Sequence, residues 1–187
     1  MVTEAVAMLR HGLALVPDLP GSDWRREREF DVQIAVAQAL SASWGARETR
    51  EAYTRARQLA VTLNRPRALL FALYGQYSYH WARADFKRAR ELAEEIIGLG
   101  EESGDVATRV MGSYASGLAC FQVGEFTAGR AYFEEALALF DPTDRLAYAE
   151  LLPTDPHVQV RIHSCWLLGC LGHVDQALSR QIGRAHV

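Results

Sequence analysis

A short turn recurs three times along this chain of 187 residues, and each copy lies between two stretches with helical periodicity. The three copies are Ala84-Asp85-Phe86, Gly124-Glu125-Phe126 and Gly172-His173-Val174. Each begins with a small residue that can end a helix and finishes with an apolar residue that can open the next one. A turn of this kind joins two antiparallel helices, so its recurrence predicts a chain built from helix pairs.

The spacing of the turns predicts the fold class. The copies lie about 40 and 48 residues apart, and the extra length falls between Asp141 and Pro156. Helix pairs that recur every 20 to 50 residues or so are typical of α-solenoids, in which each pair covers its apolar face by stacking on its neighbours. No segment alternates polar and apolar residues as a strand does. We therefore expect an all-α fold, an α-solenoid of about four antiparallel helix pairs.

We expect one repeat domain over residues 1–180. Proline, glycine and asparagine breaks place its pairs approximately at 27–63, 66–100, 105–140 and 157–180. Asp155 suits a helix N-cap and Pro156 the first helical position. Residues 1–16 form an amphipathic pattern that we interpret as a helix left from a preceding pair, so we expect that a larger protein was cut here.

The end of the sequence breaks the helical pattern. Its last six residues, IGRAHV, equal one reading frame of a common sequencing-library adapter, and Gln181 fits the first bases of that adapter. We expect residues 181–187 to be an artefact. A genomic read that continues through IGRAHV into an open frame would contradict this interpretation.

One repeat has a specific family resemblance. The segment GLACFQVGEFTAGRAYFEEALALF, residues 117–140, resembles a tetratricopeptide repeat (TPR). The family's signature positions are occupied by Gly117, Gly124, Phe126, Gly129, Phe133 and Ala136. The resemblance implies that the small residues let the paired helices approach closely and that Phe133 packs between them.

Three longer segments resemble the repeat region of large bacterial signalling proteins: LVPDLPGSDWRREREFDVQIAVAQALSAS, EAYTRARQLA and RARELAEEIIGLGEESGD. Those proteins join a class III adenylate/guanylate cyclase domain, or a DNA-binding regulator, to a predicted signal-transduction ATPase and then to helical repeats. The resemblance implies a cytoplasmic regulatory module that binds a protein or peptide and contacts neighbouring domains of its own chain. None of the residues in this chain is itself cyclase, ATPase or DNA-binding sequence.

Charge and composition argue against several other classes. The formal charge of -3 does not favour binding to a phosphate backbone. No apolar run approaches the roughly 20 residues that a membrane span needs. The three cysteines include no CxxC pair, which fits a reducing cytoplasm. We expect no nucleic acid and no membrane among the partners.

Motifs for catalysis and cofactor binding are missing from the sequence. It contains no GxxxxGK[ST], no strand-borne GxGxxG and no nucleophile elbow. The only His/Cys cluster consists of His157, His163, Cys165, Cys170 and His173. Its spacing matches no zinc template, and core cysteines with surface histidines are the simpler interpretation. We expect no enzyme activity, no cofactor and no metal.

A run of alternating charge, Arg25-Arg26-Glu27-Arg28-Glu29, lies at the start of the first helix pair. Such a run is most simply the solvated start of a helix. Anion binding by its three arginines is the alternative.

One set of large apolar side chains recurs in the first helix of successive pairs. With each turn as a register mark, and by analogy with the TPR groove, the inner face presents Phe71, Tyr74, Trp81, Met111, Tyr114, Phe121, Ile162 and Trp166. Such a column on a concave surface can bind an amphipathic helix or an extended peptide. We expect Tyr74, Trp81 and Tyr114 to be exposed, and exposure below roughly a tenth would place them in the core instead.

The sequence thus predicts a non-catalytic protein-interaction module. Two alternatives remain open at this point. The chain could be a fragment that completes a cyclase or ATPase active site, or a structural spacer without a ligand, whose aromatic side chains pack between neighbouring helices.

Overall fold

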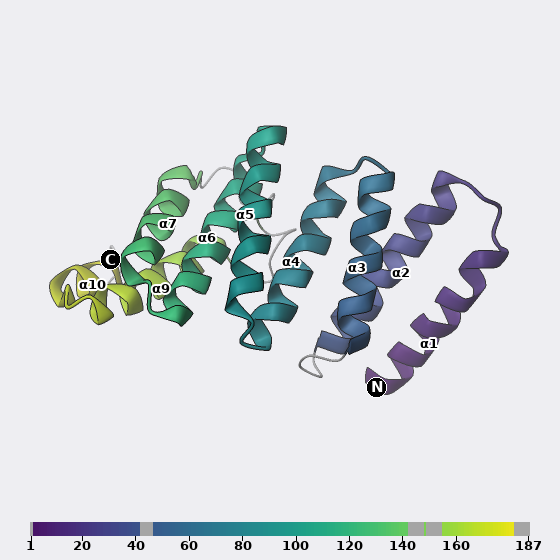
Figure 1. The fold of residues 1–187 in the computed structure, drawn as a ribbon, viewed down its shortest axis with the longest axis horizontal. Coiled ribbons are helices and arrows are strands. Elements are labelled where there is room, and N and C mark those ends of the chain that lie inside the picture. The colour runs from purple at the N-terminus through teal and green to yellow at the C-terminus, as the bar shows by residue number, and fades with distance from the viewer. Residues whose placement is uncertain (1, 42–46, 142–147, 149–154, 182–187) are drawn as a thin grey trace, which may run out of the picture. The chain divides into compact units, whose positions relative to one another are not determined.

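The computed structural model describes residues 2–41, 47–141, 148 and 155–181. The regular structure in these ranges is helical and includes no strand. The helices belong to two compact units, Met1–Asp85 and Phe86–Val187. Figure 1 shows their order along the chain.

In the first unit, successive helices pack against one another. Its elements are α1 (Val2–Leu15), η1 (Val16–Asp18), α2 (Asp23–Ser41), α3 (Arg47–Thr62) and α4 (Pro66–Ala82). Helix α1 packs on α2, α2 on α3, and α3 on α4 (Figure 1). The amphipathic helix expected over residues 1–16 is confirmed, and Leu9 and Leu13 on its apolar face pack against the core of this unit.

That core lies between α1, α2 and α3. Its buried side chains are Val6, Val36, Ala37, Leu40, Ala52 and Tyr53. The ring of Tyr53 also contacts α4, because a Cβ atom at Gly75 would overlap it. Glycine at this position therefore permits the close crossing of α3 and α4.

The second unit contains the TPR-like segment at residues 117–140. Its elements are α5 (Phe86–Ser103), α6 (Val106–Val123), α7 (Phe126–Leu139), α9 (Pro156–Cys170) and α10 (Val174–Gln181). Helix α9 begins as expected: the Asp155 side chain accepts a hydrogen bond from the amide of His157, and Pro156 occupies the first helical position.

The three recurring turns have the same backbone geometry. In each, the middle residue donates its amide hydrogen to the carbonyl five residues earlier: Asp85 to His80, Glu125 to Cys120, and His173 to Leu168. The residue before it is left-handed, with φ of +59° at Ala84, +82° at Gly124 and +80° at Gly172. This bonding pattern closes a helix C-terminus and gives the turns a common register.

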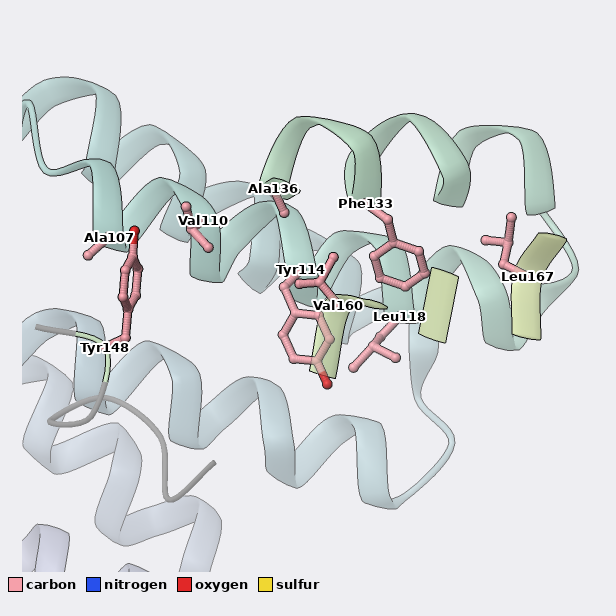
Figure 2. Close-up of a cluster of buried hydrophobic side chains, with 9 residues drawn as sticks. All are labelled: Ala107, Val110, Tyr114, Leu118, Phe133, Ala136, Tyr148, Val160 and Leu167. Carbon is pink, nitrogen blue, oxygen red and sulfur yellow. The ribbon is translucent and has the colours of Figure 1, made fainter. Parts of the chain in front are cut away.

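One core cluster of the second unit is formed mainly by α6, α7 and α9 (Figure 2). Phe133 of α7 is buried in this core, and a Cβ atom at Gly117 would lie 2.5 Å from its ring. A Cβ atom at Gly129 would lie 2.9 Å from Leu167 and 3.2 Å from the Gly117 carbonyl oxygen. Gly117 and Gly129 of the TPR signature therefore occupy close helix crossings, and Phe133 packs between the helices as the resemblance implies.

Helices α6 and α7 correspond to the pair expected at 105–140, and α9 and α10 to the pair at 157–180. Helices α2 and α3 cover the range expected at 27–63, but residues 42–46 between them lie outside the described residues, as do residues 182–187 of the expected artefact. The pair at 66–100 spans both units. Its pairing and the grouping of 1–180 into one domain stay predictions.

Candidate functional site

The eight side chains predicted to line a groove come from α4, α6 and α9, which belong to different units. Phe71, Tyr74 and Trp81 on α4 are half-buried. Burial raises the pKa of the Tyr74 hydroxyl to about 12. The indole Nε1 of Trp81 is buried and has no hydrogen-bond partner in the part of the chain that the structure describes.

The residues on α6 correct part of the prediction. Met111 is 1% exposed and Tyr114 is 5% exposed, so the expectation that Tyr114 lies on an open surface is wrong. Phe121 is half-buried and packs against the core and the ring of Phe126. The physical reason is that α6 packs against α5, α7 and α9 at once, so that its residues from Ala107 to Cys120 are buried except for half-buried Arg109.

Tyr114 reaches α9 through His163. The two ring centroids lie 5.7 Å apart. Nδ1 of His163 is 2.8 Å from the carbonyl oxygen of Gln159 and 3.5 Å from the Tyr114 hydroxyl. Because a carbonyl oxygen can only accept, Nδ1 carries the hydrogen and donates it to Gln159. Burial lowers the pKa of His163, which favours the neutral imidazole.

The predicted residues on α9 are exposed, unlike those on α6. Ile162 is 40% exposed and Trp166 is 57% exposed, and Val158, one turn earlier, is 50% exposed. Residues four apart share one face of a helix, so these three side chains form an apolar stripe, which we call the α9 face. The sequence prediction omitted Val158. Its spacing of four residues from Ile162 would have placed it on the same face of the helix.

The common turn geometry shows what the α9 face corresponds to. A shift of 48 residues relates the hydrogen bond of Glu125 and Cys120 to that of His173 and Leu168. The same shift relates Val158, Ile162 and Trp166 to Val110, Tyr114 and Leu118 of α6.

On α6 this stripe is covered. Val110, Tyr114 and Leu118 lie in the core cluster together with Val160 and Leu167, which come from α9 (Figure 2). The α9 face is therefore the equivalent of a surface that already receives a helix in this protein.

The cysteines and the possible metal ligands were the other candidate groups in the sequence. Cys120 and Cys165 are buried, and burial raises the pKa of both thiols, while Cys170 is exposed. Within residues 2–41, 47–141, 148 and 155–181, His, Cys, Asp and Glu side chains form no group of three or more that could hold a metal ion. No helix in the same ranges has the length and apolar character to cross a membrane.

Comparison with solved structures defines the fold class. The apo form of RapI superposes with a TM-score of 0.82 at 11% sequence identity, over 98% of this chain and 48% of RapI. BtubC (BKLC) from P. vanneervenii gives a TM-score of 0.76 at 16% identity, over 96% of this chain and 70% of BtubC. A putative kinesin light chain from Podospora anserina with nearly identical TPR-like repeats gives 0.71 at 15% identity, over 100% of this chain and 90% of the other.

These likenesses confirm the expected fold class, an all-α α-solenoid of TPR-like helix pairs. The chain spans about half the length of RapI. No protein-family model matches the sequence, and no curated protein matches it.

Proposed function

We propose that this chain is a non-catalytic protein-interaction module that binds an amphipathic helix of a partner protein along the α9 face. The observation that carries the proposal is the exposure of Val158, Ile162 and Trp166, whose equivalents on α6 are buried against a helix. An exposed apolar stripe of this kind marks a site of interaction with another protein. The helix that covers the equivalent stripe on α6 shows what kind of ligand would fit it.

The dimensions of the α9 face suit a helical ligand. From Val158 to Trp166 the stripe extends for about 12 Å along the helix axis. Helix-in-groove recognition uses anchors at i, i+3, i+4 and i+7, which span a similar length. On α6, the covering helix presents Val160 and Leu167, a spacing of i and i+7. The partner helix should therefore carry aliphatic residues seven positions apart on its contacting face.

Trp166 is the expected anchor of this surface. Tryptophan is enriched among the few residues that carry most of the binding energy of an interface. Its indole packs edge-on against His163, with ring centroids 5.0 Å apart, so the ring is supported on one side and open to solvent on the other.

The experiment uses a synthetic peptide of residues 155–171 with a fluorophore at its N-terminus. This peptide carries Val160 and Leu167, the side chains that pack with the equivalent stripe on α6. Fluorescence anisotropy should show saturable binding to the full chain. Trp166→Ala should weaken binding about tenfold or more, as expected for a hot-spot residue. Val123→Ala is the matched control, because Val123 is an exposed valine of α6 outside the α9 face.

Three results would contradict the proposal. If no peptide binds saturably, the alternative of a spacer without a ligand is favoured. If Val123→Ala weakens binding as much as Trp166→Ala, the interaction is nonspecific apolar adhesion. ATP hydrolysis or cyclic-nucleotide synthesis that depends on an arginine of this chain would favour the alternative of an enzyme fragment.

The sequence resemblance supports a wider setting for this module. It is that of a cytoplasmic repeat region in a multidomain bacterial signalling protein, where partner binding is coupled to neighbouring domains of the same chain. Sequencing the full-length gene tests this part directly, because a cyclase, ATPase or DNA-binding domain should flank the repeats.

A further inference from the structure

A pocket lies in the first unit where α1 ends and η1 leads the chain into α2. It encloses about 260 Å³. Its lining residues are Leu13, Val16, Pro17, Arg25, Glu29, Gln33 and Arg55. The pocket shares no residue with the α9 face, and the inference drawn from it is independent of the proposed function.

The pocket has an apolar wall and a polar wall. Leu13, Val16 and Pro17 provide the apolar side chains, from the end of α1 and from η1. The polar wall includes three residues of α2 at positions i, i+4 and i+8, which share one face of that helix: Arg25, Glu29 and Gln33. Arg55 joins them from α3.

Two of the charged groups in the pocket satisfy each other. Nε of Arg55 donates to one carboxylate oxygen of Glu29 at 2.6 Å, and Nη2 donates to the other at 3.0 Å. A bidentate pair of this kind fixes both side chains in one geometry. It also raises the pKa of Arg55.

Arg25 has no such carboxylate partner. Its guanidinium makes one long hydrogen bond, 3.4 Å, to the carbonyl of Leu19, and no acidic side chain of the described residues forms an ion pair with it. The other two arginines of the charged run are paired, Arg26 with Asp23 and Arg28 with Asp31. Unlike Arg26 and Arg28, Arg25 lines the pocket and has guanidinium N–H groups that are free to donate to a ligand.

Gln33 is the second group with unused hydrogen-bonding capacity. It is half-buried, and its side-chain amide has no hydrogen-bond partner in the part of the chain covered by the structure. An amide group supplies two N–H donors and a guanidinium supplies five. Both side chains therefore have N–H donors to offer a ligand in the pocket.

The charge and size of the pocket define the class of ligand. Arg25, Arg55 and Glu29 together leave one positive charge, which favours an anion of single charge. The volume is below the roughly 300–1,000 Å³ of typical cofactor and drug sites, so it suits a group of amino-acid size. The apolar wall favours a ligand with methylene groups beside its charge.

We propose that this pocket binds a carboxylate on a short aliphatic stem, held by the Arg25 guanidinium and the Gln33 amide, with its methylene groups against Leu13, Val16 and Pro17. A peptide offers this chemistry in two ways, as an acidic side chain or as its C-terminal carboxylate. The experiment below distinguishes these two sources.

The test is an NMR titration of the full chain labelled with ¹⁵N, observed at the Arg25 Nε–H and Gln33 amide signals. Three peptides of otherwise identical sequence are compared: one with a single Glu and an amidated C-terminus, one with Gln and an amidated C-terminus, and one with Gln and a free C-terminus. Saturable shifts at both signals are expected from a peptide with a carboxylate, with affinity at least tenfold weaker for the peptide that has none. The two carboxylate peptides show which source fits the pocket.

Substitutions locate the effect. Arg25→Ala should weaken binding at least tenfold, and Gln33→Leu should weaken it severalfold. Arg26→Ala is the matched control, because it removes the same charge from the same turn of α2 but from a residue paired outside the pocket, and it should change the affinity less than twofold. Circular dichroism of each variant checks that the helices are retained.

Three outcomes overturn the proposal. The first is the lack of a saturable shift at Arg25 with any of the peptides. The second is an equal loss of affinity in Arg25→Ala and Arg26→Ala, which would indicate general charge attraction. The third is binding of inorganic phosphate as tight as that of the carboxylate peptides, which would replace the aliphatic carboxylate with a different anion.

Discussion

The ring of Tyr114 in α6 packs against the imidazole of His163 in α9, with centroids 5.7 Å apart, although 49 positions separate the two residues in the sequence. The ring centroid of Phe133 in α7 lies 6.3 Å from that of Tyr114 and 6.4 Å from that of His163. The three rings therefore meet where three helices of the second unit converge, and this cluster is where substitutions should have their largest effects.

Tyr114→Ala should lower the free energy of unfolding by about 3–5 kcal/mol, because it removes a large buried ring and leaves a cavity. Trp166→Ala, on the exposed α9 face, should stay within about 0.5 kcal/mol of the parent. Urea denaturation followed by circular dichroism measures both. Equal losses in the two variants would show that Trp166 is as buried as Tyr114.

The pKa of His163 predicts a dependence of stability on pH. Burial lowers this pKa in the folded chain, so protons bind more tightly to the unfolded chain. The contribution of the neutral imidazole is present above the ordinary pKa of about 6.5 and is lost as the pH falls through the lower value of the folded state. His163→Gln should therefore flatten the fall in stability between neutral and mildly acidic pH. An NMR titration that places the His163 pKa at or above its ordinary value would contradict this prediction.

Gly129→Leu should destabilise the second unit by about 1–3 kcal/mol, because the added side chain overpacks the crossing of α7 with α6 and α9. Gly98→Ala in α5 is the control. A Cβ atom at Gly98 meets no other atom within 4 Å, so alanine should stabilise the helix by up to about 1 kcal/mol. Thermal melts of the two variants should shift in opposite directions. An unchanged melt for Gly129→Leu would mean that this crossing is open.

Asp105→Ala should lower stability by about 1 kcal/mol, because it removes the N-cap of α6. The Asp105 side chain accepts hydrogen bonds from the amide of Ala107 at 3.0 Å and from the hydroxyl of Thr108 at 2.8 Å. Asp105→Asn keeps an acceptor oxygen and should retain most of the stability. If both variants lose the same amount in urea denaturation, the charge at the helix N-terminus is responsible and the cap bond is not.

Features that depend on residues close in sequence could be predicted from the sequence. The helix end at Gly124, the cap at Asp155 and the packing of Phe133 between helices were all expected, and the structure confirms each of them. A turn or cap is determined by a few neighbouring residues, and the TPR signature specifies one close crossing. These are the signals that a single sequence contains most clearly.

The burial of Tyr114 could not be predicted in the same way. Helical periodicity identifies the face of a helix that is apolar, but α6 is apolar or small around nearly its whole circumference and packs against three helices. The sequence therefore gave no sign of which side would face solvent. Whether the Tyr114 face of α6 is open to solvent depends on where α9 packs. The position of α9 could not be inferred from the repeat period, because the connection before α9 has a different length.

The pocket beside Arg25 was missed for a related reason. The sequence shows the alternating charges around Arg25. It does not show which groups lie beside each arginine, because these come from α1 and α3. Leu13 and Arg55, which complete the pocket, are 42 positions apart in the sequence. A solvated helix start remains the correct description of Arg26 and Arg28, which are exposed and paired along α2.

The order of packing in the second unit has a consequence for how the chain folds. Helix α5 packs on α6, α6 on α7, α7 on α9 and α9 on α10, so most contacts join neighbours along the chain. Contacts of this kind close short loops at small entropic cost and allow rapid folding. The contact between Tyr114 and His163 closes a much longer loop, and we expect it to form last, after the hairpin of α6 and α7 has already emerged and folded during synthesis.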